Sequence, residues 1–179
     1  RILEGAIEEE YFAVTVHGRT VRQKYEGPSR WSFLADLTRR YPHYRIMGSG
    51  DIFTPGSIFE MLSETGVAAV SVARGSIGNP WIFRQARLLL AGQPARAPSL
   101  EEQGAVLREH FELCDRIHPE HKTRNLMRKF GIKFSRHHPE AEKAEKAFID
   151  CRTAEDWWRV LEDLYETAQA GHPAIPPPA

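Results

Sequence analysis

The chain has 179 residues, a length that suits one or two small domains. Its 24 basic residues balance its 24 acidic residues, so the net charge by itself indicates no polyanionic partner. No apolar run approaches the roughly 20 residues of a membrane-spanning helix, so no membrane association is expected. Two cysteines are too few for a disulfide framework, which favours a reducing, cytoplasmic location.

The first residues, 1–7, have the pattern of the middle of an amphipathic helix, and no basic-then-apolar signal segment opens the chain. We therefore expect a fragment. Residues 1–92 then repeat one arrangement three times: a short β-rich run, a polar loop with glycine, and an amphipathic helix. The β-rich runs are 11–16, 44–47 and 68–72, and the helices are expected at about 30–41, 55–65 and 79–90.

Local signals mark where these helices begin and end. Ser29 is the expected N-cap of the first helix, and Pro42 follows its end. Thr54 is the expected N-cap of the second helix, with Pro55 at its first position and Gly66 at its end. Asn79-Pro80 opens the third helix, and Gly92 stops it.

Strands that alternate with helices imply right-handed βαβ units and a parallel sheet. Three strands are too few for a complete doubly wound domain or a closed barrel. The expected fold class is therefore α/β: the last three βα units of a TIM (β/α)8 barrel, followed by an all-α helical domain.

The expected domain limits follow from a change in composition after the third helix. Residues 1–97 form the barrel part, with a linker at 92–98, and residues 98–168 form the helical domain. Within that domain, capping boxes at 99–102 and 153–156 open two helices, and a third helix lies around 121–135. Residues 169–179 are expected to be a disordered Pro-rich tail.

Two Gly-containing loops follow the second and third strands, at residues 48–51 (GSGD) and 73–78 (ARGSIG). Loops at the carboxyl ends of late barrel strands commonly bind phosphate through backbone N–H groups, and Arg74 adds positive charge. The alternative is that both loops are only tight strand-to-helix turns. The sequence leaves both interpretations open.

His17 and Arg19 lie at the carboxyl end of the first strand, where active sites of barrels lie. A histidine there can donate a hydrogen bond to a phosphate or to a ring carbonyl, although a single such histidine is more often structural. Asp51 can orient a sugar hydroxyl or can cap its own loop.

The segment 122–138 is basic and has no carboxylate between Glu120 and Glu140. At helical spacing its apolar side chains fall on one face, whereas its basic side chains crowd the other. The apolar set is Met127, Phe130 and Phe134, and the basic set is Arg124, Arg128, Lys129, Lys133 and Arg136. Such a face is either an RNA-backbone contact or ordinary solvated surface.

Cys114, His118 and His121 have a spacing that occurs in metal sites. The set is incomplete because no further pair of ligands accompanies it. No metal is therefore expected.

Three segments resemble the linked motifs of the tRNA-dihydrouridine synthase family. The first is residues 14–20 (VTVHGRT) with residues 23–27 (QKYEG) and Trp31, the second is 48–52 (GSGDI), and the third is 73–83 (ARGSIGNPWIF). Their order and spacing match over residues 1–92, and the basic helix is similar to the family's helical domain. Two positions differ, because the family usually has Asn at position 49 and Gly at position 73, where this chain has Ser49 and Ala73.

The resemblance implies an FMN-dependent enzyme that reduces uridines of tRNA to 5,6-dihydrouridine, with NADPH or NADH as reductant. It implies an FMN site formed by His17, Ser49, Gly50, Asp51, Ala73 and Arg74. We assign RNA contacts to Arg19, Arg124, Arg128, Lys129 and Lys133. The family's catalytic cysteine belongs to the amino-terminal half of the barrel, which is the expected partner of this chain. No catalytic residue is therefore assigned here, and the isolated chain is expected to be inactive.

Two alternatives stay open beside this interpretation. One is a non-catalytic RNA-binding fragment, and the other is a different barrel enzyme that uses FMN or a sugar phosphate.

Overall fold

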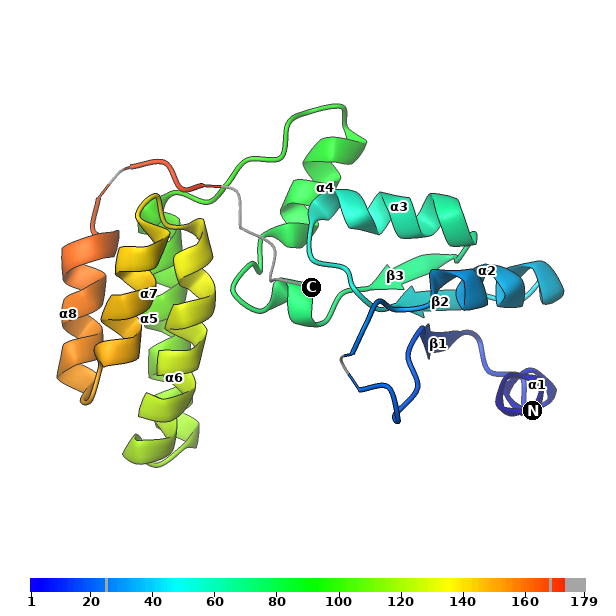
Figure 1. Cartoon of the computed structure of the whole chain (residues 1–179), viewed down its shortest axis with the longest axis horizontal. Helices are drawn as coiled ribbons and strands as arrows, with labels where there is room; N and C mark the ends of the chain where they lie inside the picture. Colours follow the sequence, from blue (N-terminus) through cyan, green and yellow to red (C-terminus); the bar gives the residue numbers. More distant parts are fainter. Residues whose placement is uncertain (25, 168, 173–179) are drawn as a thin grey trace. The chain divides into compact units, whose positions relative to one another are not determined.

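The computed structural model describes residues 1–24, 26–167 and 169–172, which form two compact units (Figure 1). The first unit comprises Arg1–Ser76 and Leu89–Ala91, and the second comprises Ile77–Leu88 and the described residues between 92 and 172. This division differs from the predicted boundary at residue 97, because most of the third helix belongs to the second unit.

The first unit alternates helices and strands. Its elements are α1 (Ile2–Glu8), β1 (Val14–His17), α2 (Trp31–Arg40), β2 (Ile46–Ser49), α3 (Pro55–Thr65), β3 (Ala69–Ser71) and the 3₁₀ turn η1 (Arg74–Ser76). The three strands form a parallel sheet in the order β1-β2-β3, with His17 opposite Ser49 and Ser49 opposite Ser71. The predicted parallel α/β arrangement is thus confirmed.

Among the described residues, helices cover one face of the sheet and leave the other bare. Helices α2 and α3 pack on the covered face (Figure 1). Leu34 of α2 and Met61 of α3 form a core there with Ile46 of β2. On β1 the side chains of Thr15 and His17 are exposed, while Val16 packs against that core. Because side chains alternate along a strand, the uncovered face is the one that carries His17.

The predicted ends of the second helix are confirmed. The Thr54 side chain accepts a hydrogen bond from the Ser57 N–H, Pro55 is the first residue of α3, and Gly66 has a left-handed φ of 68°. The prediction for Ser29 is wrong. Helix α2 begins at Trp31 with Arg30 as its N-cap and no side-chain cap, because Ser29 lies one residue before the N-cap position, where its N–H donates to Asp51.

The second unit is helical. It contains most of α4 (Ile82–Leu90), then α5 (Leu100–Ile117), α6 (Glu120–Phe134), the 3₁₀ turn η2 (Ser135–His137), α7 (Ala141–Asp150) and α8 (Ala154–Tyr165). Both predicted capping boxes are present, at Ser99 with Glu102 and at Thr153 with Asp156. Helix α4 begins two residues after the predicted Asn79-Pro80 start.

The core of this unit is aromatic. The buried Trp157 packs against Phe111 and Phe148 at centroid distances of 4.8 and 6.1 Å. A Cβ at Gly131 of α6 would overlap the Phe148 ring, so glycine lets α6 and α7 approach closely. Trp81 packs edge-on against Phe134 at 5.7 Å. This contact places the segment before α4 in the helical unit.

The tail was expected to be disordered from residue 169. Instead the Gln169 carbonyl accepts a hydrogen bond from the Leu100 N–H at 3.0 Å, and the His172 N–H donates to the His137 carbonyl at 2.8 Å. These residues are held against the helical unit by backbone hydrogen bonds. The rest of the expected tail, residues 173–179, lies outside the described residues.

Within the part of the chain that the structure describes, no helix is long and apolar enough to cross a membrane. Across the same residues, no group of three or more His, Cys, Asp or Glu side chains is placed to hold a metal ion.

Candidate cofactor-binding site

The three strands of the first unit end at one edge of the sheet. His17, Ser49 and Ser71 are the last residues of β1, β2 and β3 and are paired in register. His17 Nδ1 lies 3.3 Å from Ser49 Oγ across the two strands. The loops that carry the predicted cofactor residues therefore begin side by side.

The loop after β2 presents unpaired backbone donors. Gly50 and Asp51 have positive φ angles of 130° and 57°. Among the described residues, neither of their N–H groups has a hydrogen-bond partner. Free amides in a Gly-containing loop at a strand end are the groups that bind phosphate in other α/β proteins.

The loop after β3 lies directly against the loop after β2. A Cβ at Gly75 would overlap the backbone carbonyl of Ile52, so only glycine allows this approach. Arg74 Nη2 lies 3.1 Å from Asp51 Oδ1, and its guanidinium lies 5.2 Å from the centre of the Phe53 ring. The two loops are thus in contact, and Arg74 of one reaches the carboxylate of Asp51 in the other.

Asp51 is the centre of this site. Its carboxylate accepts hydrogen bonds from Arg19 Nη1 at 2.6 Å, from Arg19 Nη2 at 2.9 Å and from the Ser29 N–H at 2.6 Å. Burial acts to raise the pKa of Asp51, but the hydrogen bonds from Arg19 and Ser29 and the charges of Arg19 and Arg74 outweigh it and lower that pKa. The carboxylate is therefore ionised at neutral pH.

This lowered pKa predicts how the free energy of unfolding changes with pH. Ionised Asp51 contributes stability above its ordinary pKa of 3.8, and the contribution is lost as pH falls below 3.8 through the lowered folded-state pKa. The difference in unfolding free energy between the wild type and Asp51→Asn should stay constant from about pH 7 to about pH 4 and shrink below that range. Urea titrations across pH measure it. If this difference in unfolding free energy already shrinks near pH 6, then burial raises the pKa of Asp51 in the folded state, contrary to the prediction.

Arg19 does not lie where an RNA contact requires it. Its side chain is 6% exposed, both of its terminal nitrogens are bound to Asp51, and Nη2 also donates to the Gly27 carbonyl at 2.5 Å. A guanidinium that is buried in this way cannot reach a phosphate backbone. We therefore reassign Arg19 from the RNA contact to the interior of the site.

Two residues that were not among the predicted cofactor residues also bind this site. The Ser29 N–H donates to Asp51, and Trp31 Nε1 donates to the Gly50 carbonyl at 3.0 Å. The bonds join the loop after β1 and the first residue of α2 to the loop after β2. No local pattern indicates them, since the partners are 22 and 19 residues apart.

Helix α6 has the two faces that its sequence predicts. Met127 and Phe134 are buried, whereas Lys129 and Lys133 are exposed and Arg124 and Arg128 are half-buried. Within residues 1–24, 26–167 and 169–172, none of these four basic side chains has an acidic partner within 4.0 Å. The positive charge of this face is therefore not neutralised locally.

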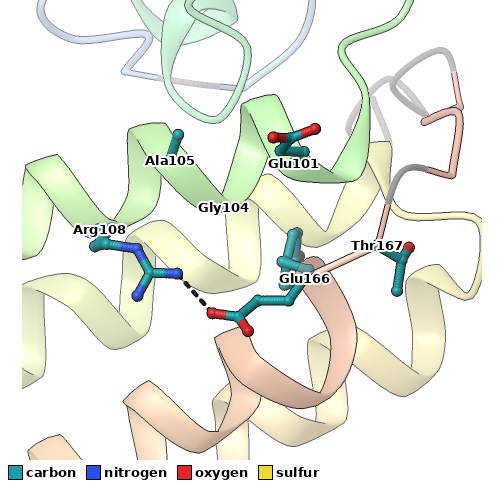
Figure 2. A pocket seen from close by; sticks show the side chains of 7 residues that line it. Glu101, Gly104, Ala105, Arg108, Glu166 and Thr167 are labelled. Atoms are coloured by element: carbon teal, nitrogen blue, oxygen red, sulfur yellow. Dashed lines mark hydrogen bonds and ion pairs between the residues drawn. The ribbon is translucent and has the colours of Figure 1, made fainter.

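The helical unit also contains a shallow hollow of about 340 Å³ (Figure 2). Its walls come from α5 and from the end of α8: Glu101, Gly104, Ala105, Arg108, Tyr165, Glu166 and Thr167. Arg108 is paired with Glu166 at 2.9 Å, as Figure 2 shows. Because two carboxylates, of Glu101 and Glu166, lie in its wall beside one arginine, this hollow offers less to a phosphate than the strand-end loops.

A family model and individual known proteins that are similar to this chain all indicate the same family. Residues 9–169 match the family model described as "Dihydrouridine synthase (Dus)". A probable tRNA-dihydrouridine synthase of Mycobacterium tuberculosis is 30% identical over 153 residues, which cover 85% of this chain and 39% of that protein. The tRNA-dihydrouridine synthase B of Xanthomonas campestris is 28% identical over 167 residues, 93% of this chain and 49% of that protein. This chain thus spans less than half of either relative.

Proposed function

Because the chain belongs to the dihydrouridine synthase family, we propose that it is part of an FMN-dependent tRNA-dihydrouridine synthase, an oxidoreductase that reduces uridine in tRNA with NADPH or NADH. The observation that carries the proposal is a pair of unpaired backbone N–H groups at the carboxyl ends of the strands. There the free amides of Gly50 and Asp51 lie beside the loop of Ala73 and Arg74.

The residues present fit the phosphate end of FMN. Two free N–H groups supply directed donors, and Arg74 supplies charge from a side chain that is 39% exposed and can turn toward an anion. His17 and Ser49 lie on the uncovered sheet face at the same edge, where they can contact the ribityl chain or the ring. Asp51 contributes its amide, since its carboxylate is already occupied by Arg19 and Ser29.

Held by the loops after β2 and β3 and reduced by NADPH or NADH, FMN would supply the hydride for the uracil ring. The chain's own residues bind the phosphate and orient the cofactor at the strand ends. The uridine must leave its stack to reach the flavin, as in other enzymes that act on a base. We assign no catalytic residue. Cys114 and Cys151 belong to the helical unit, and burial raises the pKa of both thiols, that of Cys151 to about 11.

We also propose that the sheet is the last part of a TIM barrel. Its uncovered face carries the exposed Thr15 and His17, and Tyr11 and Phe12 are exposed beside its edge strand β1. An unpaired strand edge and an uncovered face favour further strands that pair and curve around them. The additional length of the relatives is sufficient to supply these strands, as the amino-terminal half of the same barrel.

We assign tRNA binding to the basic face of α6, with Arg124, Arg128, Lys129 and Lys133. Positive side chains without acidic partners attract a phosphate backbone. Double-helical RNA is recognised mainly by shape and by backbone contacts, which such a helix can make without reading bases.

The proposal is tested with the full-length protein in its reduced and oxidised forms. We expect the purified protein to hold FMN and, with NADPH and unmodified tRNA, to form dihydrouridine detectable by mass spectrometry of digested tRNA. Arg74→Ala should weaken FMN binding about tenfold to a hundredfold, the cost of a charge-assisted hydrogen bond.

The outcomes separate the alternatives. A full-length protein that binds tRNA but does not bind FMN supports the non-catalytic RNA-binding alternative. A protein that binds FMN without reducing tRNA supports a different barrel enzyme. An FMN dissociation constant unchanged in Arg74→Ala removes Arg74 from the site.

A further inference from the structure

We propose that Arg19 is a positioning residue of the flavin site: through its buried ion pair with Asp51 it holds the loop after β2 in the conformation that presents the amides of Gly50 and Asp51 to phosphate. The inference rests on the proposed FMN function. It gives Arg19 neither contact with FMN nor contact with RNA.

The geometry of the pair is that of a fixed fork. Arg19 Nη1 and Nη2 each bind one carboxylate oxygen of Asp51, at 2.6 and 2.9 Å, and Nη2 also binds the Gly27 carbonyl. A planar guanidinium bound at both ends has no rotational freedom left to follow a ligand. Its 6% exposure excludes it from the surface.

The loop that this pair holds is unfavourable without it. Asp51 has a φ of 57°, in the left-handed region that non-glycine residues seldom adopt. The preceding Gly50 has a φ of 130°. Two successive residues in such conformations direct their N–H groups away from the ordinary strand path, so the loop needs an external restraint to stay there.

The restraint comes from the loop after β1, with described residues 18–24 and 26–30, and from Trp31, the first residue of α2. Besides Arg19, the loop supplies the Ser29 N–H to Asp51, and Trp31 Nε1 donates to the Gly50 carbonyl. Ser29 also fits between Gly18 and Gly50 so closely that a Cβ on either glycine would overlap its Oγ. These contacts join the two loops, and Arg19 is the only cation among residues 18–24 and 26–30 that is ion-paired with the Asp51 carboxylate.

Arg74 has a different place in the same site. It binds Asp51 through one nitrogen at 3.1 Å, and its side chain is 39% exposed against 6% for Arg19. The exposed arginine can exchange its contact for a phosphate oxygen, whereas the buried one cannot. The site thus has one arginine suited to binding and one suited to holding the loop.

Asp51→Asn is the decisive variant, because two explanations predict opposite signs. If Asp51 acts only as a negative charge near phosphate, its neutralisation removes repulsion and strengthens FMN binding. If Asp51 and Arg19 hold the loop, neutralisation releases the loop and weakens FMN binding. Displacement of binding groups by about 1 Å costs on the order of a hundredfold, so we expect a tenfold to hundredfold loss.

Riboflavin, which lacks the phosphate, provides the second readout. The dissociation constants of FMN and riboflavin are measured by flavin fluorescence on the full-length apoprotein. Asp51→Asn and Arg19→Met should weaken FMN tenfold or more and riboflavin less than about threefold. Both variants break the same Arg19–Asp51 ion pair. The double variant should therefore lose no more FMN affinity than either single variant. Arg39→Met, which breaks the exposed pair with Asp36, is the matched control and should change neither constant.

Three outcomes overturn the proposal: tighter FMN binding by Asp51→Asn, equal losses for FMN and riboflavin, or additive losses in the double variant. If Arg19→Met does not fold, Asp51→Asn alone decides, since the two side chains are nearly the same size. A wild type that binds neither flavin overturns the proposed function itself, and this result is distinct from the other three.

Discussion

Replacing Arg128, Lys129 and Lys133 together by Ala should weaken tRNA binding by roughly a hundredfold while the flavin content stays normal. Each lost phosphate contact costs about 1 kcal/mol, so three contacts cost about 3 kcal/mol. The fold should persist, because Lys129 and Lys133 are exposed, Arg128 is half-buried, and the buried side of α6 is formed by Met127 and Phe134. Affinity is measured in the full-length protein by filter binding.

Salt dependence shows whether the lost contacts are with phosphates. The slope of log affinity against log salt should become shallower by somewhat less than one unit for each contact removed. The matched control removes three charges from other helices of the same unit. Lys143, Lys146 and Arg159 are exposed on α7 and α8. Parallel lines for the two triple variants would show that the α6 face is ordinary surface.

Trp157→Ala should destabilise the helical unit by about 3–5 kcal/mol, the range for removing a buried aromatic side chain. Trp157 is 1% exposed and packs against both Phe111 and Phe148. Its Nε1 also donates to the Met127 carbonyl of α6 at 3.2 Å, so the substitution removes a hydrogen bond from the helix that bears the basic face. The free energy of unfolding, measured by urea titration with far-UV circular dichroism, should show the loss.

The neighbouring Trp158 is the matched control. It is half-buried and lies over Phe111 at 4.8 Å, with the Arg108 guanidinium 5.8 Å from its ring. Trp158→Ala therefore leaves a partly solvated space, and its cost should be less than half that of Trp157→Ala. If both variants lower the free energy of unfolding equally, the burial of Trp157 contributes less to stability than its contacts imply.

Features whose signals are local could be predicted from the amino-acid sequence. The Thr54, Ser99 and Thr153 caps bind residues three positions away, so type and spacing in the chain are enough to predict them. The alternation of β-rich runs with amphipathic helices likewise determined a parallel sheet. It also placed His17 and Ser49 at the strand ends, because parallel strands end at the same edge. The two faces of α6 follow from helical periodicity alone.

Roles that depend on partners distant in the chain became visible in the fold alone. The sequence placed Arg19 at the end of the first strand as an RNA contact, and it indicated Ser29 as a helix cap. Both instead bind Asp51, which lies 32 and 22 residues away, and no local pattern states which side chain meets which. A long-range contact also assigns residues 77–88 to the helical unit, because Trp81 packs against Phe134 there. Helical periodicity and capping depend on residues close together in the chain, so they can be predicted from the sequence. Burial and long-range hydrogen bonds depend on residues that meet only in the folded protein, so the structure is needed to identify them.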